Sequence, residues 1–168
     1  MVHDSIGSTG GFTVFNTIVW ASDGSANAER ALSVAKALAR ESRASLVTVH
    51  VVQRFASQRG LAVHADEEIV EARLKAVVDG LSAEGFDATL KIVNHIGPQA
   101  AHEIADVADE VGADLIVVGT RGYGPIAGLV LGSVTLRLLH VAACPVLAVP
   151  AVARPADERG VDAARVGN

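Results

Sequence analysis

The sequence has little cysteine, few aromatic residues and no excess of positive charge. Its single cysteine, Cys144, excludes an intrachain disulfide. Aromatic residues make up only 4% of the 168 residues, whereas hydrophobic residues make up 50%, so the core must be built from aliphatic side chains. The formal net charge of -5 argues against a nucleic-acid binder, which usually presents a basic surface. This composition favours a protein that holds a small ligand in a local pocket.

Long apolar runs are also absent. No run reaches the roughly 18 residues that a membrane-spanning helix needs. Residues 1–11 are polar and glycine-rich, without the basic start and apolar centre of a signal peptide. We therefore expect a cytoplasmic protein without a membrane partner. The length predicts one domain, which we place at residues 14–150, between flexible tails at 1–13 and 151–168.

Apolar segments alternate with amphipathic segments along the predicted domain. The pattern predicts strands at 17–22, 45–52, 88–93, 114–118 and 146–149, and helices at 28–42, 65–84, 97–112 and 133–143. Ser25 is expected to cap the first helix, and Pro98 to lie in the first turn of the third. Residues 53–64 are polar and irregular, so we expect a loop there.

This alternation is typical of an α/β fold with an open, five-stranded parallel sheet and helices on both faces. Alternating polarity within 88–93 indicates an edge strand. If the strand order is 3-2-1-4-5, counted along the chain, the loops after the first and fourth strands are neighbours. Ligands bind at that carboxyl edge in sheets of this kind.

The loop after the fourth predicted strand is rich in glycine. It begins with Gly119-Thr-Arg-Gly122 and, after nine residues, ends with Gly132-Ser133 at the start of a helix. Backbone amides of such a loop, together with the positive end of the helix, suit a phosphate group. Three glycines and a serine disfavour a plain tight turn. The loop lacks the lysine that closes a P-loop, so it is not that motif.

Several polar residues near these loops have two interpretations. Asp23 follows the first strand, where it either contacts a ligand or shapes the turn before Gly24. Ser133 binds a phosphate oxygen, caps its helix or does both. Arg121 either supplies a cation to phosphate or is solvated. His50, inside the second strand, is expected to be packed or hydrogen-bonded and not a ligand.

A metal site is not expected. His140 and Cys144 lie four residues apart, but Pro145 ends the helix there and no further ligands converge with them, so they do not make a zinc site.

Three stretches together resemble the universal stress protein family, in its ATP-binding branch, over about residues 13–150. They are Ile18-Val-Trp-Ala-Ser-Asp-Gly-Ser25, Gly112 to Gly122, and Gly132 to His140 with Cys144-Pro-Val-Leu-Ala-Val149. The resemblance implies the 3-2-1-4-5 order, a homodimer paired through the last strand, and a regulatory role in stress responses. It implies ATP or another adenine nucleotide as ligand, with or without Mg2+. Trp20 departs from the family pattern, in which small aliphatic residues are commoner.

The resemblance also assigns residues. Gly122, Gly132 and Ser133 match phosphate contacts, Gly119 matches a position near the ribose, and Val51 matches a contact to the base. Ala21, Ser22 and Asp23 match nucleoside contacts. The full set of predicted nucleotide-binding residues is Ala21, Ser22, Asp23, Val51, Gly119, Arg121, Gly122, Gly132, Ser133 and Val134.

No residue of these loops other than Asp23 is a candidate general base, and Asp23 is expected at the nucleoside end. We therefore predict binding with slow or no hydrolysis, and not an enzyme. One alternative is an enzyme acting on the α-phosphate, although Ala21-Ser-Asp-Gly-Ser25 lacks the Ser-Gly-Gly loop usual there. Another is a dimeric scaffold without ligand, paired along Val146–Val149. No protein partner is indicated.

Overall fold

The computed structural model describes residues 14–57, 60–62, 66–120 and 131–150. The strands are β1 (Thr17–Ala21), β2 (Ser45–Ser57), β3 (Gly60–Ala62), β4 (Ala88–Ile96), β5 (Leu115–Gly119) and β6 (Val146–Val149). The helices are α1 (Ala26–Ser42), α2 (Glu67–Ala83), α3 (Ala100–Glu110) and α4 (Ser133–Val141). No helix in these ranges combines the length and the apolar character needed to cross a membrane. The two predicted tails, at 1–13 and 151–168, lie outside the described residues.

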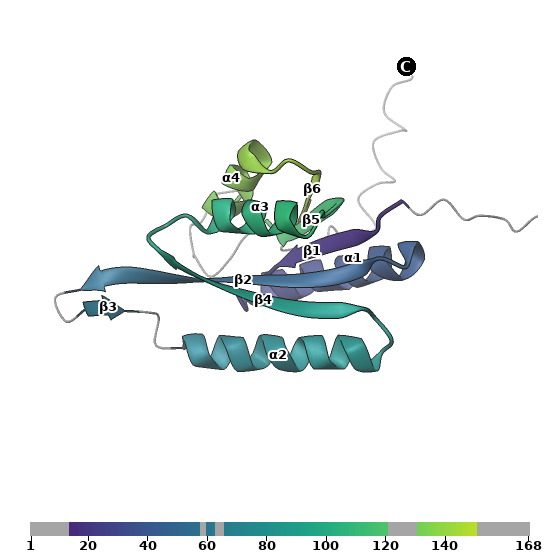
Figure 1. Cartoon of the computed structure of the whole chain (residues 1–168), viewed down its shortest axis with the longest axis horizontal. Helices are drawn as coiled ribbons and strands as arrows, with labels where there is room; N and C mark the ends of the chain where they lie inside the picture. Colours follow the sequence, from purple (N-terminus) through teal and green to yellow (C-terminus); the bar gives the residue numbers. More distant parts are fainter. Residues whose placement is uncertain (1–13, 58–59, 63–65, 121–130, 151–168) are drawn as a thin grey trace, which may run out of the picture.

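The predicted strand order is confirmed. Five strands pair in parallel as β4-β2-β1-β5-β6, which is the order 3-2-1-4-5 when the short β3 is left out. β4 lies at one edge of this parallel sheet, as its alternating polarity predicts. Because the crossovers are right-handed and the direction of winding reverses at β1, the helices lie on both faces of the sheet. Figure 1 shows α3 and α4 on one face, with α1 and α2 on the other.

The prediction of a loop at 53–64 is wrong. β2 continues to Ser57, and β3 pairs with its end in antiparallel orientation. The physical reason is pairing with β4, which runs in register from Leu46 to Arg54 and provides hydrogen bonds that the local polar sequence does not reveal. The Arg54 guanidinium also donates to Asn94 Oδ1 on β4, at 2.8 Å from Nη2.

Side chains of β1 alternate between two hydrophobic layers. Ile18 and Trp20 pack against α1 and α2, whereas Val19 and Ala21 pack against α3 and α4. All four side chains are buried. A strand buried on both faces explains why this segment is a continuous apolar run.

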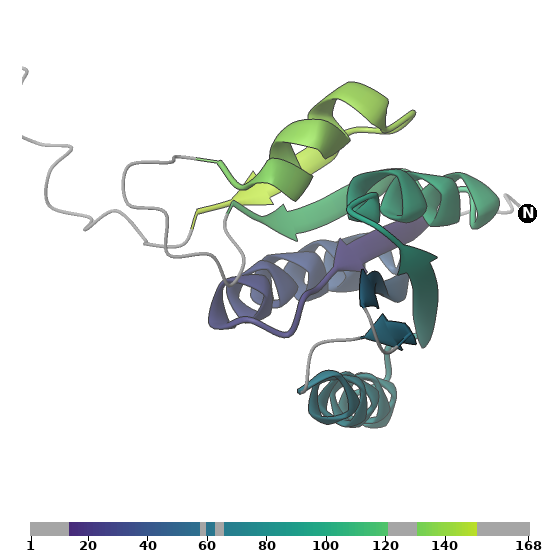
Figure 2. The same cartoon turned by 90° about the vertical axis from the view of Figure 1, so that its left-hand side faces the viewer.

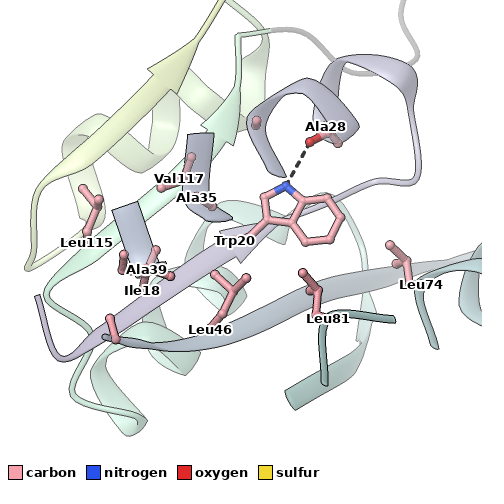
Figure 3. Close-up of a cluster of buried hydrophobic side chains, with 12 residues drawn as sticks. Ile18, Trp20, Ala28, Ala35, Ala39, Leu46, Leu74, Leu81, Leu115 and Val117 are labelled. Carbon is pink, nitrogen blue, oxygen red and sulfur yellow. Dashed lines mark hydrogen bonds between the residues drawn. The ribbon is translucent and has the colours of Figure 1, made fainter. Parts of the chain in front are cut away.

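Trp20 is accommodated by the small side chains of α1. The buried face of α1 consists of alanines: Ala28, Ala31, Ala35 and Ala39. The indole is fully buried among them, and its Nε1 donates to the Ala28 carbonyl oxygen at 3.0 Å (Figure 3). This bond ties the first turn of α1 to the central strand, so the unusual residue also fixes where the helix begins.

The predicted helix starts are within two residues of the observed ones except at α3, which begins three residues later than expected. Ser25 caps α1 as expected, because its Oγ accepts from the Ala28 amide at 3.3 Å. Pro98, however, precedes α3, which begins at Ala100 after Gln99. β4 runs on to Ile96 in its pairing with β2, so the turn at Gly97 comes later than the sequence pattern indicates.

Asp114 joins the starts of β1 and β5. Its Oδ2 accepts from the amides of Asn16 and Thr17, at 2.6 Å and 3.0 Å. These two backbone hydrogen bonds lower the pKa of the Asp114 carboxyl. Because the folded pKa is depressed, the stabilisation is present above the ordinary Asp range and is lost as the pH falls through the lowered pKa.

Two buried threonines provide a matched test of the core. Thr48 Oγ1 has no hydrogen-bond partner among the described residues, whereas Thr135 Oγ1 donates to the Gly119 carbonyl at 2.8 Å. Both residues are buried. Thr48→Val should raise the free energy of unfolding by about 1 kcal/mol, because it removes an unpaired hydroxyl, and Thr135→Val should lower it by about as much. Urea unfolding followed by Trp20 fluorescence measures both. An equal decrease in the free energy of unfolding in the two variants would contradict this description of the core.

Candidate functional site

The carboxyl ends of β1, β2 and β5 lie side by side. Ala21, the last residue of β1, is paired with Val49 on one side and Val118 on the other. The loop after β1 therefore leaves the sheet next to Gly119, which ends β5. Figure 2 shows the starts of α1 and α4 at this same edge, towards which the strand arrows point. The structure thus brings together two loops that the sequence separates by almost a hundred residues.

The loop after β1 is held by its own polar groups. The Ser22 amide donates to the Val49 carbonyl at 2.9 Å, and Ser22 Oγ accepts from the Gly24 amide at 3.1 Å. Gly24 has a φ of 79°, a conformation that glycine adopts without strain. Asp23 Oδ1 accepts from the Ser25 amide at 3.0 Å, so Asp23 shapes the turn. Its other carboxylate oxygen has no hydrogen-bond partner in the described part of the chain.

The two described ends of the segment between β5 and α4 are joined by hydrogen bonds. The Thr120 amide donates to the Val149 carbonyl at 2.8 Å, and the Gly132 amide donates to the Thr120 carbonyl at 2.6 Å. Thr135 on the first turn of α4 bonds Gly119, as described above. Although Arg121 and Gly122 lie outside the described residues, both ends of the glycine-rich segment are fixed together.

Among the described residues, no side chain caps the start of α4. Gly132 is the N-cap, with extended backbone at φ −69° and ψ 157°, so the interpretation of Ser133 as the cap is wrong. Ser133 is instead the first helical residue and is exposed. The first turn of α4 contains no acidic residue, whereas those of α1, α2 and α3 do. The amides of Ser133 and Val134 lack intrahelical partners by geometry and remain suited to an anion.

The remaining predicted residues lie at the same edge. Val51 follows Val49 by two residues on β2, so both side chains lie on the α3 and α4 face of the sheet. Val51 and Val134 both pack at the margin of the hydrophobic cluster on that face. Eight of the ten predicted residues are therefore in place around one edge, and the other two are Arg121 and Gly122.

Three residues of this region were missed as site residues by sequence reasoning. His50, expected to be hydrogen-bonded, places Nδ1 2.8 Å from the Ser22 carbonyl and Nε2 against the carboxylate of Glu67 on α2. Arg73, also on α2, lies 3.4 Å from the Gly24 carbonyl. These contacts join segments 17 to 49 residues apart, and no local sequence pattern indicates them.

The edge carries groups that can form hydrogen bonds to a ligand. It offers backbone amides at the start of α4, the hydroxyl of Ser133 and one carboxylate oxygen of Asp23. In the ranges described, no group of three or more His, Cys, Asp or Glu side chains is placed to hold a metal ion. His140, one of the pair considered for zinc, directs Nδ1 to the Leu136 carbonyl at 2.8 Å within its own helix.

Comparisons with known proteins all point to one family. The profile of the Universal stress protein family matches residues 15–150. The universal stress protein Sll1654 of Synechocystis sp. is 35% identical over 145 residues, which cover 85% of this chain and 90% of that protein.

Two solved structures are similar in both fold and sequence. One is a universal stress protein from Archaeoglobus fulgidus in complex with dAMP, with a TM-score of 0.58, 29% identity and coverage of 81% of this chain and 98% of that chain. The other is a universal stress protein in complex with cAMP, with a TM-score of 0.56, 28% identity and coverage of 81% and 97%. With its sheet order, its glycine-flanked helix start and these matches, the chain belongs to the universal stress protein family.

Proposed function

We propose that this protein binds an adenine nucleotide, ATP in particular, at the carboxyl edge of its sheet and acts as a regulator in the stress response. The observation that supports this most is the convergence of the β1 loop with the uncapped start of α4. The uncapped helix start suits phosphate, and the loop suits a nucleoside. Relatives of similar fold are known in complex with dAMP and cAMP, which supports an adenine nucleotide as the ligand class.

In this proposal the phosphates lie at the start of α4. The amides of Ser133 and Val134 and the Ser133 hydroxyl contact phosphate oxygens, since the positive end of a helix favours an anion. Gly132 allows close approach because it has no side chain. Gly122 and Arg121 complete the phosphate contacts from the segment between β5 and α4, and Mg2+ is accommodated through the phosphates.

The nucleoside lies over the ends of β1 and β2. Asp23 contacts the ribose through the carboxylate oxygen that the turn leaves unused, and Gly119 flanks the sugar. Ala21 and Ser22 contact the nucleoside through their backbone, and Val51 packs against the base. In this arrangement Asp23 both shapes its turn and binds, so its two interpretations are compatible.

We propose that hydrolysis is slow or absent. A hydrolase positions a base or an activated water at the γ-phosphate. The only hydrogen-bond partner of the Asp23 carboxylate in the described residues is the Ser25 amide. Asp23 also belongs to the nucleoside end of the site, away from the terminal phosphate. The role proposed is therefore that of a nucleotide-dependent regulator, whose states differ in affinity for the ligand.

We also propose a homodimer formed through β6. β6 lies at one edge of the sheet, and an edge strand can pair with a second chain. Leu147 on β6 is 37% exposed, and Leu136 and Leu139 on the adjacent α4 are each 51% exposed. Apolar side chains beside an unpaired edge favour burial against a second copy.

Calorimetry with ATP, ADP, AMP and cyclic AMP tests the ligand and the site. Gly132→Val should weaken ATP binding by at least about tenfold, because a side chain at the helix start restricts access to its amides. Gly122→Val should also weaken ATP binding. The φ of −69° at Gly132 suits any residue, so the backbone is not strained by the change.

Gly80→Val is the matched control. Gly80 lies in the last turn of α2, and beyond its own helix backbone no atom of the described residues lies within 4 Å of the position where a Cβ would be added. This variant should bind as the wild type does. Unchanged affinity in both Gly132→Val and Gly122→Val would place the nucleotide elsewhere. No binding of any nucleotide by the wild type would leave the ligand-free dimeric scaffold as the better description.

Sedimentation velocity tests the dimer. Leu147→Glu should convert it to monomer, because a charge would be buried in the interface. Ile92→Glu is the control, since Ile92 lies on the opposite edge strand, β4, and is also 37% exposed. It should leave the dimer intact. A monomeric wild type, or a Leu147→Glu variant that stays dimeric, would contradict pairing through β6.

A further inference from the structure

A buried histidine contacts the loop after β1, to which we assign the nucleoside. His50 is only 5% exposed, and its ring contacts Ser22 on one side and Glu67 on the other. We propose that His50, oriented by Glu67 from α2, is the positioning residue that sets the conformation of the Ser22–Gly24 loop for ligand binding. This inference rests on the proposed nucleotide function and adds to it a residue that does not itself contact the ligand.

The two partners of the ring determine where its protons lie. The Ser22 carbonyl can only accept a hydrogen bond. Glu67 either accepts as a carboxylate, with both ring nitrogens protonated, or donates as a carboxylic acid to an unprotonated Nε2. In both cases Nδ1 carries a proton and donates to Ser22. Glu67 holds the Nε2 side of the ring and so keeps Nδ1 turned towards Ser22.

Each polar group of Ser22 is then occupied. Its amide bonds Val49, its hydroxyl bonds the Gly24 amide, and its carbonyl bonds His50. The peptide joining Ser22 to Asp23 cannot rotate without breaking the last of these bonds. Because Ser22 is buried, its carbonyl would be left unpaired without His50, and a buried unpaired carbonyl is unfavourable. The direction of Asp23, which follows this peptide, thus depends on His50.

α2 supplies a second contact to the same loop. Arg73 donates to the Gly24 carbonyl at 3.4 Å and forms an ion pair with Glu29 on α1. Arg73 is 55% exposed and its hydrogen bond is long, so it contributes less to holding this loop than the buried His50–Glu67 pair does. Glu67 is 13% exposed, which makes the His50–Glu67 contact the better protected of the two.

Two variants of His50 separate its two contacts. Asparagine places its amide nitrogen near the position of Nδ1, so His50→Asn keeps a donor for Ser22 and loses Glu67. Glutamine places its amide near the position of Nε2, so His50→Gln keeps a partner for Glu67 and loses the donor to Ser22. His50→Asn should bind ATP within about threefold of the wild type, and His50→Gln should bind about tenfold more weakly or worse.

Controls address general loss of structure. Thr48→Val changes the same strand two residues earlier, on the same face, and should leave ATP affinity unchanged. Glu67→Ala should weaken binding, whereas Glu68→Ala, at the exposed neighbouring position, should not. Thermal unfolding of each variant shows whether affinity follows stability. The inference is wrong if His50→Gln binds as the wild type does, or if both His50 variants lose affinity in proportion to stability.

A measurement without nucleotide separates this inference from the proposed function. Backbone amide chemical shifts of Asp23 and Gly24 in the free full-length chain should change strongly in His50→Gln and weakly in His50→Asn. If the wild type binds no nucleotide, the proposed function fails, and these shifts still decide whether His50 sets the loop. Unchanged shifts in His50→Gln would overturn the positioning role even if ATP binds.

Discussion

The proposed site depends on the burial of β1 between β2 and β5. Parallel pairing on both sides removes the freedom of this strand to slide or twist alone. Its entry is fixed by the Asp114 carboxylate, and its exit by the hydrogen bond from Ser22 to Val49. A loop that leaves such a strand starts from a defined point and direction. Because the strand is held in this way, short polar contacts can set the geometry of the loop after β1.

Helix placement at the same edge follows from packing against β1. The alanine face of α1 makes room for Trp20, and the indole nitrogen bonds the first turn of that helix. On the other face, Leu138 of α4 is fully buried in the hydrophobic cluster that also contains side chains of β1 and β5, and Thr135 bonds the end of β5. Both helix starts are therefore located by contacts to the central strands. The phosphate end and the nucleoside end of the proposed site are therefore both positioned by the central strands of the sheet.

Family membership and ligand identity rest on different observations. The match over residues 15–150 and the strand order place the chain among universal stress proteins. Relatives in complex with dAMP and cAMP show that this fold is used for adenine nucleotides in those proteins. In this chain, the uncapped start of α4 and the unused oxygen of Asp23 are the features that support the same ligand class. Trp20 bonds the first turn of α1, and the His50–Glu67 pair contacts the loop after β1, so both lie at that edge in this chain.

The sequence by itself determined the order of strands and helices, because apolar periodicity reports which segments are buried and on how many sides. Together with the family resemblance it also indicated the glycine-flanked loop and the Ser25 cap, since both are local motifs. Only the tertiary structure decided the length of β2, the cap at Gly132 and the partners of His50. Each of these depends on groups distant in sequence. β4 extends β2 by pairing with it, Thr120 positions Gly132, and Glu67 on α2 contacts His50 on β2. Such contacts leave no local pattern, because a side chain meets its partner only after the sheet has formed.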